Sequence, residues 1–252
     1  MTDPPTPPTD PRIERLLVEG PSATAFVTLP GGRYRMGSPM RGDEQPERDV
    51  TIAAFAVAIT PVTNREYRAF LEATGHDEPR FWDDPRFNAA DCPVVGISWF
   101  DANEYCEWLG ALLGRICRLP TEAEREYAAR GDVTTHFPWG DDPWIEGRFA
   151  LGSQGTDRPY RVGSTPPNGF GLYHMAENVH EWCSDWYGNP YDPADVDDPR
   201  GPADGVRRAS RGGSWRHRVK VTRSTARSSL SPERQYNDYG MRVYAEVTAD
   251  RG

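Results

Sequence analysis

The stretch Arg211-Gly212-Gly213-Ser214-Trp215 is the part of the sequence that is most informative about the fold. Its two glycines lack the spacing of a phosphate-binding loop and indicate a turn instead. The residues around it, 207–225, are predicted to be strand. After the tryptophan the chain continues into a basic run without cysteine, Arg216-His217-Arg218-Val219-Lys220-Val221-Thr222. The segment therefore joins a conformationally restricted turn to a set of polar side chains.

Length and composition favour one loop-rich domain. The chain has 252 residues, of which 24 are glycine and 24 are proline, and this usage favours short elements joined by turns. Its net charge of −9 argues against general nucleic-acid binding, which needs a basic face. No apolar run approaches the roughly 18 residues that span a membrane. We therefore expect neither nucleic acid nor a membrane as a partner.

The N-terminal residues differ in composition from the rest. Residues 1–8 are acidic and rich in proline, without the basic and apolar regions of a secretory signal peptide. We expect residues 1–22 to be a disordered tail, residues 23–252 to be a single domain, and the protein to be cytoplasmic. The cysteines lack zinc-ligand spacing and are expected to be reduced, buried thiols: Cys92, Cys106, Cys117 and Cys183.

Helix caps and apolar periodicity predict an α+β chain with two or three helices. The predicted helices begin at residues whose side chains can accept from backbone amides: Thr63, Ser98 or Asp101, and Thr121. The first is expected to end at Gly75 and the third at Gly131. Short strands are predicted as a hairpin over residues 25–36, as a strand over residues 50–59, and as a final strand over residues 240–247.

Four motifs, in order along the chain, resemble the formylglycine-generating enzyme family, also called sulfatase-modifying factors. They are PVTNREY at 61–67 with PVVGISW at 93–99, RLPTEAEREYAARG at 118–131, PNGFGLYHMAENVHEW at 167–182, and RGGSW at 211–215. The resemblance implies a C-type-lectin-like α+β core of the formylglycine-generating-enzyme type, rich in loops and with short antiparallel strands. It also places four arginines inside the core: Arg211, Arg223, Arg227 and Arg242.

The same resemblance identifies a departure at the reactive site. In the oxidases of the family, copper-binding cysteines lie two and seven positions after the motif tryptophan. Counting from Trp215, these positions are His217 and Thr222. Thiolates select Cu(I), whereas an imidazole and a hydroxyl do not make that site. We therefore do not expect copper or conversion of cysteine to formylglycine.

The resemblance further implies a calcium site. Its ligand positions match His174, Glu177, Val179 and Glu181, so calcium is predicted there. The family usually has Asn or Asp as the first ligand, and it tends to have Trp where this chain has Arg125. The residues alone leave two further interpretations open: a metal cluster that adds His180 to the polar members of this set, or a structural turn.

The C-terminal segment is locally basic in an acidic chain. Part of it is predicted to face outward and to bind a protein or small-molecule ligand: Arg216, His217, Arg218, Lys220, Thr222, Tyr236, Asn237, Asp238 and Tyr239. Surfaces rich in arginine and aromatic residues are typical of recognition sites. This layout resembles the variable proteins of diversity-generating retroelements, whose diversified residues follow the same turn.

Two functions from different classes are compatible with these patterns. The favoured one is a ligand- or protein-binding module that uses the C-terminal segment. The alternative is a metal- and oxygen-dependent oxidoreductase of the sulfatase-modifying factor family with a rebuilt active site. In that case His217 is the candidate catalytic residue.

Overall fold

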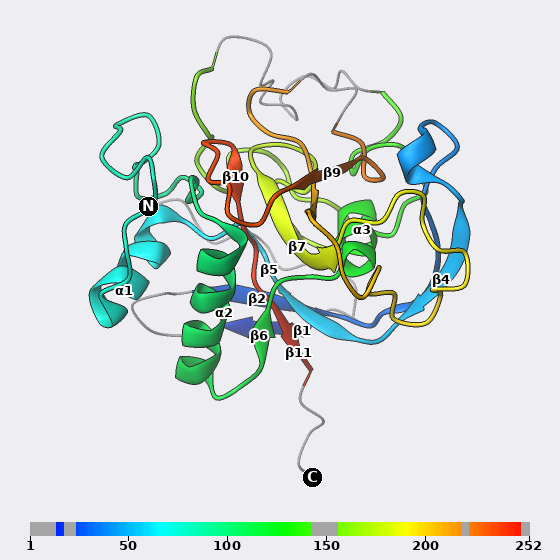
Figure 1. Ribbon diagram of the computed structural model, residues 1–252, viewed down its shortest axis with the longest axis horizontal. Coiled ribbons are helices and arrows are strands. Elements are labelled where there is room, and N and C mark those ends of the chain that lie inside the picture. Colours follow the sequence, from blue (N-terminus) through cyan, green and yellow to red (C-terminus); the bar gives the residue numbers. More distant parts are fainter. Residues whose placement is uncertain (1–13, 18–23, 143–155, 218–221, 248–252) are drawn as a thin grey trace.

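The computed structural model in Figure 1 describes residues 14–17, 24–142, 156–217 and 222–247. Its helices are α1 (Asn64–Thr74), α2 (Trp99–Leu113) and α3 (Glu122–Arg130). A capping box closes the first turn of each, and a left-handed glycine ends each: Thr63 and Gly75, Ser98 and Gly114, Thr121 and Gly131. The predicted helices are therefore confirmed.

The largest sheet has the strand order β1-β2-β5-β11-β6, with antiparallel neighbours throughout. Its strands are β1 (Glu14–Leu17), β2 (Ala25–Leu29), β5 (Phe55–Ala58), β11 (Tyr244–Glu246) and β6 (Cys117–Arg118). Strand β1 lies within the predicted N-terminal tail, so at least these four residues belong to the sheet. The rest of the predicted tail lies outside the described residues.

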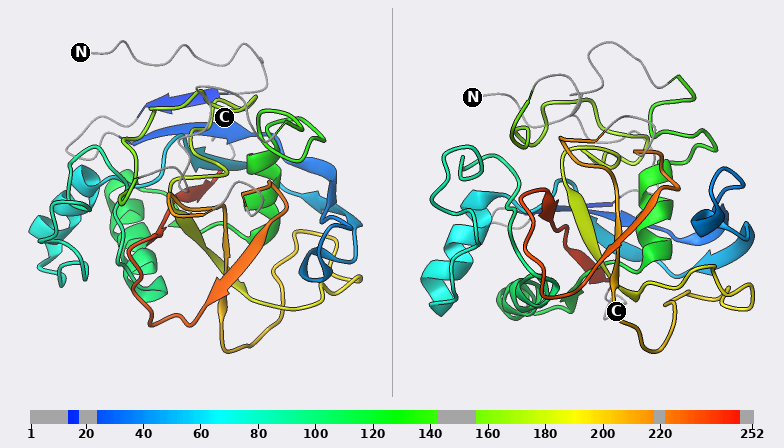
Figure 2. Two further views of the ribbon diagram at one scale, coloured as in Figure 1. Left: turned by 90° about the horizontal axis from the view of Figure 1, so that it is seen from above. Right: turned by 45° about the horizontal axis from the view of Figure 1, so that its top comes forward.

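A second sheet positions the functional segment. Its order is β10-β7-β8-β9, from β10 (Tyr239–Gly240), β7 (His180–Trp186), β8 (Arg208–Arg211) and β9 (Arg227–Leu230). Strand β10 runs parallel to β7, whereas β8 is antiparallel to both β7 and β9. In Figures 1 and 2, α1 and α2 lie on one side of this sheet and α3 on the other.

The strand predictions were partly wrong. The expected hairpin over residues 25–36 does not form, because β3 (Gly32–Met36) pairs with β4 (Arg48–Ile52) in a separate sheet, and a short 3₁₀ helix, η1 (Gly42–Glu44), lies between β3 and β4. Gly31 makes the change of sheet possible, since a Cβ there would lie 2.3 Å from the carbonyl oxygen of Ile52. Of the single strand expected over residues 207–225, only β8 forms in the described residues; the glycine turn follows it, and β9 begins later, at Arg227.

Buried arginine–carboxylate pairs tie the elements together. Nε of Arg125 in α3 donates to Glu181 Oε2 at 2.6 Å, and Nη2 of Arg242 lies 3.0 Å from Oε1 of the same carboxylate. Glu122 accepts from Arg211 and Arg227, and Glu44 from Arg223. The four arginines placed in the core by the resemblance are buried, which confirms that expectation.

Charge pairing outweighs burial at the central carboxylate. Burial alone would raise the pKa of Glu181, but Arg125 and Arg242 hold it below its ordinary value. The carboxylate is therefore ionised inside the core and links α3 and the segment before β11 to β7.

The cysteines are free thiols, of which Cys106, Cys117 and Cys183 are buried and Cys92 is half-buried. None forms a disulfide, and burial raises the pKa of each thiol. None of the described helices is long and apolar enough to cross a membrane.

We predict that Glu181→Gln destabilises the fold strongly. The substitution leaves two buried guanidinium groups without their counter-charge, which typically costs about 3–5 kcal/mol. Urea unfolding measures the change, and Glu72→Gln, on the exposed side of α1, is the matched control with less than about 0.5 kcal/mol. A loss below about 1 kcal/mol at Glu181 would contradict the role of this pair.

A second prediction concerns Asp185 in β7, which accepts a hydrogen bond from the backbone N–H of Glu122 at 3.0 Å. Burial and the charge of Glu122 raise the pKa of Asp185 from 3.8 to about 7. Between these values the folded state holds a proton that the unfolded chain has lost, so stability falls as the pH rises.

Replacement of Asp185 by Asn removes this dependence. The stability of the variant relative to wild type should therefore grow between about pH 4 and 7 and stay constant above that range. Urea unfolding at several pH values measures it, with Asp83→Asn, at an exposed position, as the surface control. A pH-independent difference at Asp185 would show that its pKa is not raised.

Candidate metal centre

The Gly-Gly-Ser-Trp turn leaves β8 in a conformation that glycine permits. Gly212 has φ +78°, and a Cβ on Gly213 would lie 2.1 Å from Cγ2 of Thr222 and 2.9 Å from the carbonyl oxygen of Ala176. The methyl group of Thr222 thus packs directly on the turn, and neither glycine tolerates a side chain.

Trp215 anchors the end of the turn. Its backbone N–H donates to the carbonyl of Asn178 at 2.8 Å, and its indole N–H donates to the carbonyl of Asn237 at 3.3 Å. The backbone N–H of His217 then donates to Ser214. These bonds hold His217 between the start of β7 and the loop that precedes β10.

His180, the first residue of β7, faces this position. Its side chain is buried, and its ring lies 4.8 Å from the His217 ring and 4.7 Å from the Tyr239 ring, measured between centroids. Burial and the neighbouring His217 lower the pKa of His180 to about 3, although a backbone hydrogen bond to Gly212 acts in the opposite direction. The imidazole is therefore neutral, and its Nδ1 has no hydrogen-bond partner.

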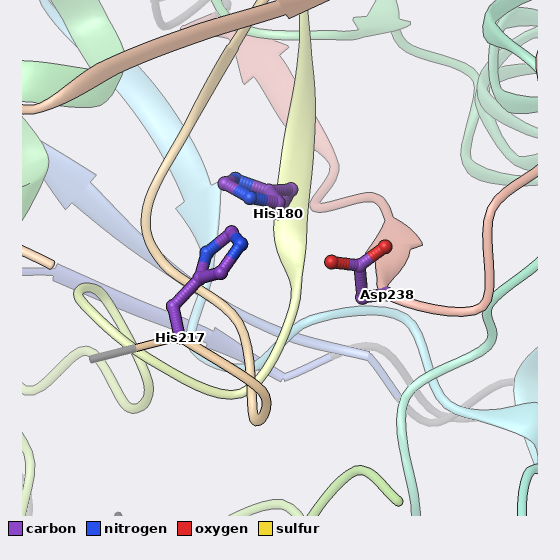
Figure 3. Close-up of side chains that lie close together, drawn as sticks. All are labelled: His180, His217 and Asp238. Atoms are coloured by element: carbon purple, nitrogen blue, oxygen red, sulfur yellow. The ribbon is translucent and has the colours of Figure 1, made fainter. Parts of the chain in front are cut away.

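His217 and Asp238 complete the group. His217 is half-buried; burial lowers its pKa, which Asp238 counteracts. Its Nδ1 also has no hydrogen-bond partner. Asp238 Oδ2 accepts from the hydroxyl of Ser214 at 3.0 Å, while Oδ1 accepts no hydrogen bond and lies 3.6 Å from Nη1 of Arg216. One ligand atom from each of His180, His217 and Asp238 lies within 4.8 Å of the others (Figure 3).

This arrangement is suited to holding a metal ion. A buried polar atom without a partner costs about 1–3 kcal/mol, and Nδ1 of His180 and Nδ1 of His217 are two such atoms. Two neutral imidazoles and one carboxylate form a donor set that binds divalent first-row transition metals. Within the described residues it is the only group of three or more His, Cys, Asp or Glu ligand atoms at this spacing.

The predicted ligand-binding segment divides into two parts. Arg216 and Tyr236 are exposed, and Arg216 Nη1 donates to Asn237 Oδ1 at 3.0 Å. The other described members were expected to face outward but are buried or half-buried: His217, Thr222, Asn237, Asp238 and Tyr239. The residues Arg218 and Lys220 lie outside the described part of the chain. Ligand binding at this face stays a prediction.

The residues predicted to bind calcium have other partners. Both carboxylate oxygens of Glu181 already accept from Arg125 and Arg242. The guanidinium of Arg125 also donates to the carbonyl of Met175. This guanidinium and the carbonyl oxygen of Val179 both border Gly212. A cationic side chain thus already lies beside these oxygens.

His174 and Glu177 are paired with each other. The backbone N–H of Gly163 donates to Nε2 of His174, so Nδ1 carries the proton and donates to Glu177 Oε1 at 2.8 Å. Glu177 also accepts from the hydroxyl of Thr165. These residues do not fit a calcium ion in this arrangement, and calcium at His174, Glu177, Val179 and Glu181 stays a prediction from the resemblance.

Sequence reasoning identified two members of the metal group and missed the third. His217 and Asp238 were both predicted site residues, but His180 was considered only with His174. The two are in fact separated, since His174 bonds within its own loop and His180 begins a strand. The parallel pairing of Tyr239 with His180 brings His180 to the group, and no pattern in the local sequence indicates this pairing.

Comparisons with known proteins show the family to which the chain belongs. A family model, the sulfatase-modifying factor enzyme 1-like domain, matches residues 15–247. Serine/threonine-protein kinase pkn1 of Chlamydia pneumoniae is 35% identical over 90% of this chain, which spans 39% of that kinase. The formylglycine-generating enzyme of Streptomyces coelicolor is 33% identical, with 92% of each chain covered.

Two solved structures have a similar fold. The structure of PvdO from Pseudomonas aeruginosa has a TM-score of 0.79 at 30% identity, covering 91% of this chain and all of that one. Variable protein 1 of Treponema denticola has a TM-score of 0.80, covering 94% of this chain and 100% of its own, but at 22% identity it shows a shared fold alone. The α+β, C-type-lectin-like fold predicted from the sequence is confirmed.

We predict that calcium does not stabilise the protein. Occupation of a site by an ion that binds the folded state raises the melting temperature. Because Glu181 is already bound by two guanidinium groups, addition of calcium to protein freed of metal by a chelator should leave the melting temperature unchanged. Scanning calorimetry measures this, and a saturable rise of several degrees would establish the calcium site.

Proposed function

Because the chain belongs to the sulfatase-modifying factor family, we propose that it is a metal-dependent oxidoreductase of that family with a rebuilt site. In this proposal His180, His217 and Asp238 hold a divalent transition metal, and two imidazoles with one carboxylate are the ligand set of oxygen-activating iron(II) sites. The observation that carries the proposal is the convergence of one ligand atom each from His180, His217 and Asp238 within 4.8 Å of one another.

The position of the group supports this function. His217 occupies the first of the two positions that are cysteine in the copper oxidases of the family, so a metal ligand replaces a metal ligand. Thr222, at the second position, is buried against Gly213. The remaining ligands come from β7 and from the residue before β10, which the second sheet holds side by side.

The residues of this chain have distinct roles in the proposed site. His180 stays neutral because it is buried, which keeps its ring nitrogen available as a ligand. Ser214 orients Asp238 by donating to its other oxygen at 3.0 Å. A bound iron(II) would supply oxygen activation, since two imidazoles and one carboxylate leave coordination positions open for oxygen and substrate.

The structure gives less support to the binding module that the sequence favoured. The binding module relied on an outward face, yet three of its described members are buried. One observation still favours it: Tyr236 is 44% exposed and lies beside the exposed Arg216–Asn237 pair. Binding of a protein or small-molecule ligand at these three residues is the second candidate function.

Metal analysis of purified protein tests the proposal. The protein is loaded anaerobically with iron(II), zinc or copper, and bound metal is measured by mass spectrometry. We expect one equivalent per chain in the wild type. Loss of one ligand in His217→Ala or Asp238→Asn should lower the affinity at least about 100-fold.

His136→Ala is the matched control, because His136 is an exposed histidine far along the chain from this group. It should bind metal as the wild type does. Absence of stoichiometric metal under all loading conditions, or equal binding by His217→Ala and the control, would refute the metal centre.

A further inference from the structure

A cavity of about 500 Å³ lies at the opposite end of β7 from His180. Asp185 and Trp186 line it from β7, some 16 Å of strand away from His180 at the usual rise per residue. Its apolar walls are Met36, Trp186, Pro190, Tyr191, Pro199 and Pro202. The volume is in the range of small-molecule sites, and the cavity shares no residue with the metal group.

One wall carries a cationic group with an unused donor. Arg48 in β4 is 7% exposed, and its guanidinium lies 4.0 Å from the centroid of the Tyr191 ring. Its Nε donates to the carbonyl of Asp195 at 3.2 Å, while Nη1 is buried without a hydrogen-bond partner. Arg48 lines the cavity, so its guanidinium offers positive charge and N–H donors to an acceptor bound there.

The second arginine of the cavity is already neutralised. Nε and Nη2 of Arg227 donate to the two oxygens of Glu122 at 2.6 and 2.7 Å, and Nη1 donates to the carbonyl of Asp43. Arg48 is therefore the cation in this wall that a ligand can engage.

Carboxyl groups surround the rest of the cavity. Asp185 is buried, and both of its side-chain hydrogen bonds use Oδ2. Asp192 and Asp195 line the more exposed side. A simple anion would satisfy Arg48 but face Asp192 and Asp195, and a simple cation would leave Arg48 unsatisfied.

We propose that this cavity binds a small zwitterion of the α-amino-acid type. Its carboxylate accepts from Arg48, its ammonium group faces Asp192 and Asp195, and its side chain lies against Trp186 and the proline rings. The site is independent of the metal centre and does not depend on the proposed oxidation.

The test uses the free L-amino acids, each compared with its deaminated acid and its decarboxylated amine. Isothermal titration calorimetry measures binding to the wild-type chain. We expect at least one amino acid to bind in the millimolar range or tighter, and both of its analogues to bind at least about tenfold more weakly.

Two variants locate the binding in this cavity. Arg48→Met should lose at least about tenfold in affinity, whereas Arg33→Met, on the neighbouring strand β3 and 73% exposed, should bind as the wild type does. Asp192→Asn, at the exposed side of the cavity, should weaken binding without affecting folding. Circular dichroism verifies that each variant is folded.

The proposal is overturned if none of the amino acids binds. It is equally overturned if an analogue lacking one charge binds as well as its parent. Unchanged binding by folded Arg48→Met, or by Asp192→Asn should Arg48→Met not fold, would also reject this cavity as the site.

Discussion

The carboxylate of Glu181, held between Arg125 and Arg242, is the interaction on which this structure depends. It connects β7 to α3 through one guanidinium and to the segment before β11 through the other. Arg242 also donates to the carbonyls of Ala58 and Tyr173, so the carboxylate anchors a network that crosses between the sheets. Breaking one partner of such a buried pair leaves an uncompensated charge, and this makes the geometry hard to change.

The same interaction sets what the neighbouring residues can do. Successive side chains of a strand point to opposite faces, so holding Glu181 toward α3 directs His180 away from it. His180 then lies against Tyr239 and His217, next to the glycine turn. Asp185, four residues after Glu181, returns to the first turn of α3 and borders the cavity. One strand thus serves a proposed metal centre at one end and a proposed ligand site at the other.

The sequence predicted those features whose signals are local. The three helices were predicted because each combines apolar periodicity with a residue that can cap its first turn, and the structure shows these caps to be Thr63, Ser98 and Thr121. Strand β7 was missed because its buried residues include Glu181 and Asp185, which no local apolar alternation reveals. The burial of Glu181 depends on two arginines that lie 56 and 61 residues away in the sequence. The burial of Asp185 depends on tertiary packing.

For the metal group, too, the sequence predicted the features with local signals and missed a long-range contact. His217 and Asp238 could be named as site residues from the turn and the segment that follows it. Their meeting with His180 depends on the parallel pairing of β10 with β7, a contact between distant parts of the chain. The surroundings of Arg48 could not be predicted from the sequence either. Tyr191 and Asp195 contact Arg48, and Asp185 lines the same cavity, but all three lie far from Arg48 in the sequence.

X-ray absorption spectroscopy of the iron(II)-loaded protein tests the central claim most directly, since it reports the ligands themselves. The account predicts nitrogen and oxygen ligands only, with the outer-shell scattering of two imidazole rings that is lost in part when either His180 or His217 is replaced. Scattering from sulfur, or a spectrum free of imidazole features, would contradict it and would place the metal elsewhere in the chain.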